Sequence, residues 1–140
     1  MDRVTVMTAV MQALLTDRAA PDGDPDAVGA GVLLADSRFV VAGLPVAREC
    51  FGRLGARFRP LVEDGTRVDA GDALGELGGP LAAMRGAAPT AIRLLARLSA
   101  IASEQRLPEP DDEIDLYAAR LSRGEPVCDD GPSFHLEMRD

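Results

Sequence analysis

Apolar residues recur at the three- and four-residue spacing of an amphipathic helix in four segments of the chain. These segments cover residues 4–18, 46–54, 90–103 and 111–123. In the first segment we expect one apolar stripe, formed by Val4, Met7, Val10, Met11, Leu14 and Leu15. In the third segment we expect an inward face formed by Ile92, Leu94, Leu95, Leu98, Ile101 and Ala102.

A short apolar segment at residues 81–85 precedes the third helix. Residues 86–89, Gly-Ala-Ala-Pro, separate the two. Glycine weakens a helix and an internal proline removes a backbone hydrogen bond, so this stretch predicts a break between two helices. In the second helix, Pro45 fits the first position and Cys50 falls on the apolar face, which places its thiol in the core.

Strand patterns fill the rest of the chain. Residues 28–44 read as two buried strands that turn back at Asp36 and Ser37, which predicts a β-hairpin. Residues 60–79 alternate short strands with two turns, and Gly65 and Gly71 supply the positive φ that such turns need. Residues 134–138 alternate Phe, Leu and Met with His and Glu, as in a half-buried edge strand.

The central stretch carries the pattern V-x-D-G-x-x-V-x-x-G-D-x-L, which resembles that of biotinyl and lipoyl domains. With the flanking helices it predicts an α+β fold: a small barrel-sandwich, hammerhead-like sheet flanked by helices, without a TIM barrel. The chain has no lysine, because all 15 basic residues are arginine. A carrier with a biotinyl-lysine or lipoyl-lysine, and Schiff-base chemistry, are therefore excluded.

Composition and charge limit the number of domains, the kinds of partner and the location that we expect for this chain. The chain has 140 residues, 46% of them hydrophobic, which suits one domain. Its net charge of −8 disfavours nucleic acid and membrane surfaces as partners. No apolar run approaches the ~18 residues of a membrane span, and the N-terminus does not have the layout of a signal peptide. We therefore expect a cytoplasmic protein.

Several motifs follow one another in the order found in the N-terminal domain of quinolinate phosphoribosyltransferase (nicotinate-nucleotide pyrophosphorylase, carboxylating). Five motifs of that domain have counterparts in this chain. A-L-x-E-D resembles residues 13–17, G-D-x-T resembles residues 23–26, and a-G-x-x-V-A resembles residues 42–47. D-G-x-x-V-x-x-G-D-x-L-x-x-x-x-G resembles residues 64–79, and E-R-T-A-L-N-F-L-Q-R-L-S-G-I-A-T resembles residues 88–103. The resemblance implies that residues 1–103 form a domain of this kind. Residues 104–140 would then add a linker, a helix and a C-terminal strand that pack on the same domain.

Two departures from the family qualify what the resemblance implies. In the family an (α/β)8-type barrel follows, which needs on the order of 200 or more residues, and 37 residues follow position 103 here. The family's E-R arginine reaches the carboxylates of quinolinate on the neighbouring subunit. At the matching positions this chain has Ala88 and Pro89, which carry no charge.

Arg93 and Arg97, four residues apart on one helix, are the candidate anion-binding residues. With Ser99 they form the candidate substrate-binding set; the alternative is that the arginines are solvated or ion-paired with acidic residues such as Glu104. No nucleophile–base pair is visible, and we predict no catalytic residue, metal site or cofactor. The single histidine, His135, is expected at the surface.

The first functional hypothesis is a stand-alone, non-catalytic phosphoribosyltransferase-like domain. It would act as partner subunit or regulator of a barrel-containing pyridine-carboxylate phosphoribosyltransferase, and would be inactive by itself. The alternative is a repurposed small enzyme or binding protein for a small carboxylate held by Arg93 and Arg97. Apolar surface that the family packs on a barrel needs cover, so we also expect a homodimer.

Overall fold

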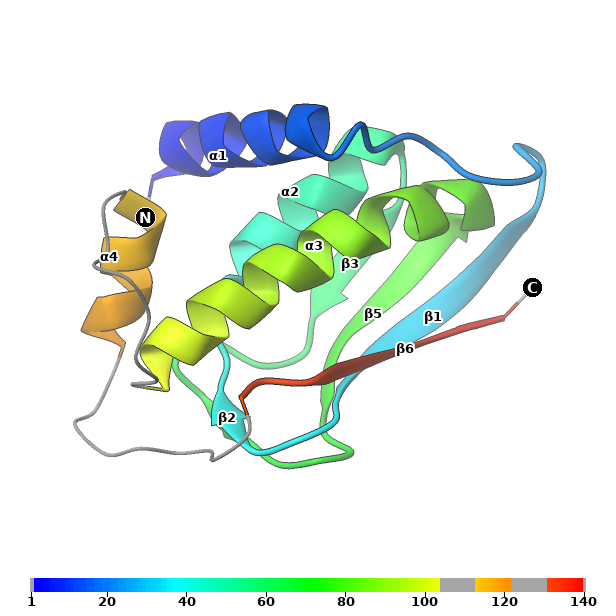
Figure 1. Cartoon of the computed structure of the whole chain (residues 1–140). Helices are drawn as coiled ribbons and strands as arrows, with labels where there is room; N and C mark the ends of the chain where they lie inside the picture. Colours follow the sequence, from blue (N-terminus) through cyan, green and yellow to red (C-terminus); the bar gives the residue numbers. More distant parts are fainter. Residues whose placement is uncertain (1, 104–112, 122–130, 140) are drawn as a thin grey trace.

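The computed structural model describes residues 2–103, 113–121 and 131–139. These residues form helices and strands in mixed order along the chain (Figure 1). The elements are α1 (Arg3–Thr16), β1 (Val28–Ala35), β2 (Phe39–Val40), α2 (Leu44–Leu54), β3 (Arg57–Pro60), β4 (Arg67–Val68), β5 (Ala73–Pro80), α3 (Leu81–Ala102), α4 (Glu113–Arg120) and β6 (Phe134–Arg139).

A four-stranded antiparallel sheet in the order β3-β5-β1-β6 forms one layer of the molecule. The long helix α3 crosses this sheet, and α2 lies beside it against β3 (Figure 1). A separate two-stranded sheet pairs β2 with β4. The α+β class is therefore confirmed, and no barrel is present in the part of the chain that the structure describes.

The predicted hairpin of residues 28–44 is wrong. β1 pairs with β5 on one edge and with β6 on the other, so neither edge is available to β2. β2 instead pairs with β4, with Phe39 opposite Val68. The error arises because apolar alternation reveals a strand but not its partner, and both partners of β1 lie more than 35 residues further along the chain.

The predicted break before Pro89 is also wrong, because α3 runs unbroken from Leu81 to Ala102 with Pro89 inside it. Pro89 is exposed, so its ring lies on the solvent side, whereas Ala87, Ala88 and Ala91 are buried. An internal proline costs about 3 kcal/mol. The helix persists because burial of its apolar face along this length outweighs that cost.

The apolar stripe of the first helix is only partly buried. Val10 and Leu14 face the core as expected, together with Val6. Val4, Met11 and Leu15 remain 72%, 46% and 75% exposed. Both sides of α1 carry apolar residues, so the sequence pattern did not single out the side that packs.

Ser99 of α3 and Ser103, the residue that follows the end of this helix, hold β2 and the residues directly after it. The Val40 N–H donates to Ser103 Oγ at 2.8 Å, and the Ala42 N–H donates to Ser99 Oγ at 3.0 Å. Both serine side chains are fully buried. The amides of Val40 and Ala42 are thus satisfied by serine side chains at the end of α3, while the Val41 N–H between them donates to the carbonyl of Thr66 at 3.0 Å.

The core placement of Cys50 is confirmed. The residue is fully buried on α2. Burial raises the pKa of its thiol to about 12, so it stays protonated and unreactive at neutral pH. None of the described helices has the length and apolar character needed to cross a membrane.

We expect Ser99→Ala to lower the free energy of unfolding by about 1–3 kcal/mol, because the buried Ala42 N–H would lose its acceptor. Urea unfolding at neutral pH measures this as a lower midpoint. Thr8→Ala, at an exposed position of α1, is the control and should leave the midpoint almost unchanged. An unchanged midpoint for Ser99→Ala would contradict the structural role of this hydroxyl.

Candidate functional site

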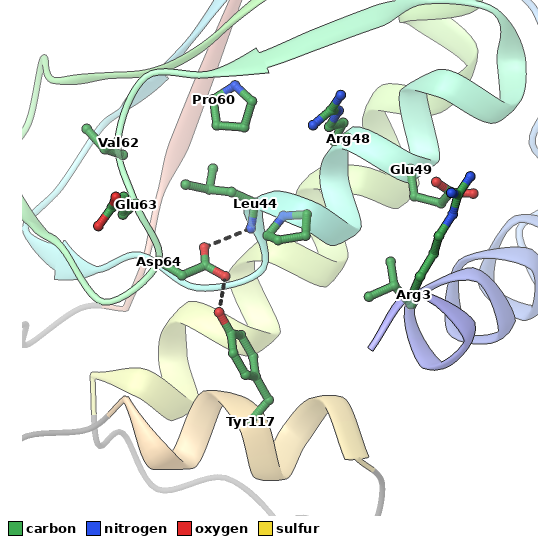
Figure 2. A pocket seen from close by; sticks show the side chains of 11 residues that line it. Arg3, Leu44, Arg48, Glu49, Pro60, Val62, Glu63, Asp64 and Tyr117 are labelled. Atoms are coloured by element: carbon green, nitrogen blue, oxygen red, sulfur yellow. Dashed lines mark hydrogen bonds between the residues drawn. The ribbon is translucent and has the colours of Figure 1, made fainter. Parts of the chain in front are cut away.

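A concavity of about 770 Å³ opens where α1, α2, α4 and the loop after β3 meet (Figure 2). Its polar lining comes from four separate parts of the chain. Arg3 opens α1, Arg48 and Glu49 lie on α2, Glu63 and Asp64 follow β3, and Tyr117 comes from α4. Its apolar lining is Val6, Leu44, Pro45, Pro60 and Val62.

Asp64 joins two elements at the floor of this concavity. One carboxylate oxygen accepts from the Leu44 N–H at 3.0 Å, and the other accepts from the Tyr117 hydroxyl at 2.7 Å (Figure 2). The helix α2 begins after Gly43, which has no side chain to cap it, so Asp64 satisfies an amide at the helix start from outside. Both oxygens of Asp64 are therefore engaged in holding the fold.

Tyr117 is a hydrogen-bond donor here rather than a base. Burial and the hydrogen bond to the negative Asp64 both raise the pKa of its hydroxyl. The hydroxyl therefore remains neutral across the physiological range. It ties α4 to the turn that follows β3.

The guanidinium groups of Arg3 and Arg48 are the binding groups at the rim. Neither makes an ion pair with another residue that the structure describes, whereas Glu49 pairs with Arg53 at 2.8 Å. A guanidinium suits carboxylate or phosphate recognition through paired hydrogen bonds. Next to the apolar wall, these two arginines equip the concavity for binding an anionic group attached to an apolar one.

The arginines that the sequence singled out lie elsewhere. Arg93 projects from α3 and pairs with Asp17 at 3.0 Å, with half of its side chain exposed. Asp17 also accepts from the Thr90 hydroxyl at 2.6 Å. This hydrogen bond, followed by the one from Arg93, lowers the pKa of the Asp17 carboxyl below its usual value.

Arg97 forms a two-point ion pair with Asp115 of α4. Its Nε donates to one carboxylate oxygen at 3.0 Å, and a terminal nitrogen donates to the other at 2.5 Å. The Asp115 side chain is fully buried, and that of Arg97 is 39% exposed. The pair fastens α4 onto α3.

The three predicted substrate-binding residues therefore do not meet in the concavity of Figure 2. Arg93 and Arg97 each hold a carboxylate of this chain, and Ser99 is buried against Ala42. The lining residues escaped the sequence analysis because they come from distant segments. The only sequence signals were the Asp-Gly turn at Asp64 and the one tyrosine of the chain, Tyr117.

Within the described ranges, no three His, Cys, Asp or Glu side chains lie close enough together to hold an ion.

Replacing Thr90 with Val should raise the pKa of Asp17 toward its usual value, because the strongest hydrogen bond to the carboxylate is lost. NMR titration of the Asp17 carboxyl measures the change, and Thr90→Ser should keep the lowered pKa. A lowered pKa stabilises the fold fully above the pKa of the unfolded carboxyl, about 3.9. This stabilisation disappears as the pH falls through the folded value. An unchanged pKa in Thr90→Val would contradict the assigned role.

The fold recurs in several solved structures. It is similar to nicotinate-nucleotide pyrophosphorylase from Francisella tularensis, with a TM-score of 0.65 and 21% identity over 73% of this chain and 39% of that one. For NadC from Streptococcus pyogenes the TM-score is 0.66, with 23% identity over 74% and 40%. For nicotinate-nucleotide pyrophosphorylase from Ehrlichia chaffeensis it is 0.67, with 13% identity over 89% and 54%.

The chain thus spans about two fifths to one half of these structures. A search of curated proteins finds no match. The family model described as "Quinolinate phosphoribosyl transferase, N-terminal domain" matches residues 4–99, which include all of α1 except its first residue and all of α3 except its last three. Motif order, fold and family model agree, and the chain belongs to the quinolinate phosphoribosyl transferase N-terminal domain family.

Proposed function

We propose that this domain acts as a non-catalytic partner subunit or regulator of a barrel-containing pyridine-carboxylate phosphoribosyltransferase. The observation that carries the proposal is Pro89. It stands where the family motif has its substrate-binding arginine, and it is exposed on the surface of α3. The domain keeps the family's scaffold while the charged group that the scaffold would present to a substrate is replaced by an uncharged ring.

The two arginines that follow Pro89 on α3 support this proposal, because each is already ion-paired with a carboxylate of this chain. Arg93 lies one turn beyond Pro89 and is held by Asp17, and Arg97 lies a further turn along and is held by Asp115. A carboxylate ligand would have to displace both of these carboxylates from their arginines. The alternative of a small carboxylate-binding protein using Arg93 and Arg97 therefore has less support than the partner-subunit function.

The concavity of Figure 2 is the surface that we assign to the partner. Its rim offers the Arg3 and Arg48 guanidinium groups, and its wall offers Pro45, Pro60 and Val62. The two carboxylate oxygens of Asp64 are already engaged, and Tyr117 is neutral. These groups suit a partner loop that carries one acidic and one apolar side chain, and they do not form an acid–base pair.

We place this function in the cytoplasm. A buried, reduced thiol such as that of Cys50 is common in reducing compartments. The enzyme that the domain would assist would use small metabolites of that same compartment, the cytoplasm. Fractionation of the native cells tests the location.

The purified protein should form no nicotinate mononucleotide from quinolinate, phosphoribosyl pyrophosphate and Mg²⁺. The physical reason is that no guanidinium occupies the Pro89 position and no barrel is present among the described residues. Product formation can be followed by chromatography. Turnover by the isolated chain above the uncatalysed rate would overturn the non-catalytic assignment.

Partner binding is tested with the purified barrel-containing quinolinate phosphoribosyltransferase of the same cells. Arg48→Ala should weaken its affinity about tenfold, the loss expected when an arginine that contacts the partner is truncated, as measured by calorimetry. Arg67→Ala is the matched control, because Arg67 is an exposed arginine on β4 outside the concavity. No measurable binding of the unaltered domain would refute the partner function, and equal effects of both variants would refute the assigned surface.

A further inference from the structure

Among the described residues, no strand pairs with the outer edge of β6. β6 is the last strand in the order β3-β5-β1-β6 and pairs with β1 over six consecutive residues without an interruption (Figure 1). The Asp36 N–H donates to the carbonyl of Ser133 at 2.8 Å, so these two residues form a hydrogen-bonded pair of the antiparallel ladder. This pair fixes which residues of β6 turn their backbone groups toward β1. The backbone groups of His135, Glu137 and Arg139 therefore face β1.

It follows that the backbone N–H and C=O groups of Phe134, Leu136 and Met138 point outward from the sheet. No backbone hydrogen bond from another described residue reaches them. The side chains of the same three residues are half-buried on the helix side of the sheet. Those of the alternate residues, His135, Glu137 and Arg139, are exposed on the other side.

An open edge of this kind is a template for another strand, and proteins normally block it with proline, lysine, a bulge or a short strand. The opposite edge of this sheet follows that rule, because β3 has four residues and ends at Pro60. β6 has six residues, no proline and no bulge in its pairing with β1. Its charged side chains, Glu137 and Arg139, lie on the exposed face of the sheet, so the backbone groups of the β6 edge are accessible to another strand.

We propose that two copies of this chain join through antiparallel pairing of their β6 strands, with Leu136 on the two-fold axis. The sequence Phe-His-Leu-Glu-Met is palindromic in its chemistry about Leu136. In this register Phe134 lies opposite Met138 of the second copy, Leu136 opposite Leu136, and His135 opposite Glu137. Aromatic–apolar pairs across strands are stabilising, and an imidazole N–H of His135 can donate to the Glu137 carboxylate of the second copy.

The backbone favours the same register. With Leu136 on the axis, the outward groups of Phe134, Leu136 and Met138 all find partners, which gives roughly six hydrogen bonds between the copies. Moving the axis to Glu137 places two Glu137 carboxylates opposite each other and reduces the count to roughly four. Moving it to His135 opposes the two His135 rings. The register on Leu136 is therefore the one that satisfies backbone and side chains together.

The dimer interface is distinct from the partner surface of Figure 2, since β6 does not line that concavity. It joins two four-stranded sheets into one continuous sheet. It also covers the half-exposed apolar row of Phe134, Leu136 and Met138. The inference does not rest on the proposed partner function, and either can fail alone.

Analytical ultracentrifugation of the full chain at neutral pH should give a mass near twice the 14.8 kDa of one copy. His135→Glu places a carboxylate opposite Glu137 of the other copy at two sites, and should weaken the dimer about tenfold or more. The double exchange His135→Glu with Glu137→His again places one histidine opposite one carboxylate at both sites in this register and should restore the dimer. A monomeric unaltered chain, or a double exchange that does not recover, overturns the proposal.

A measurement on the unaltered chain guards against misfolded variants. The amides of Phe134, Leu136 and Met138 point to the open edge, so their hydrogen exchange should slow as the protein concentration rises. The amides of His135 and Glu137, bonded to β1, serve as the internal control and should change little. Equal, concentration-independent exchange of the three outward amides in a dimeric sample would place the interface elsewhere and refute the β6 pairing.

Discussion

The docking of the segment after β2 onto α3 is the contact on which the remaining architecture depends. The Ser99 and Ser103 hydroxyls accept the amides of Ala42 and Val40 in a region without water access. A buried amide without an acceptor is costly, so this pair of contacts fixes where the chain leaves β2 and where α2 begins. The start of α2 forms one wall of the concavity in Figure 2, and its position follows from these two serines.

Several polar side chains of this domain form hydrogen bonds or ion pairs that hold one helix or loop to another. Asp17 ties the end of α1 to Thr90 and Arg93 of α3, and Asp64 ties α2 to Tyr117 of α4. Such groups cannot readily serve a substrate, because releasing them would expose a buried or half-buried partner. This is the physical reason why a binding function has more support here than a catalytic one.

Two surfaces of the described residues offer groups to a partner. One is the concavity with the Arg3 and Arg48 guanidinium groups at its rim. The other is the outer edge of β6, where the backbone groups of three residues pair with no other described strand. They differ in chemistry, since the first offers charge beside apolar carbon and the second offers a hydrogen-bond ladder. The two proposals, an unlike partner at the concavity and a second copy at β6, are therefore compatible with each other.

The sequence by itself determined the α+β class, the buried face of α3, the glycine turns at Gly65 and Gly71, and the half-buried alternation of β6. Each of these follows from local periodicity or from a backbone angle that one residue type favours. The order of motifs also identified the family, which the family model supports over residues 4–99.

Only the tertiary structure decided the partners of β1, the continuity of α3 through Pro89 and the side on which α1 packs. It also decided which residues the candidate arginines contact. Arg93 pairs with Asp17 and Arg97 pairs with Asp115, and these partners lie 76 and 18 residues away along the chain. Local pattern records what each residue prefers. Which distant residue becomes its partner depends on the packing of the whole domain, because the free energy gained by burying many side chains outweighs the local preference of a single proline or a single charge.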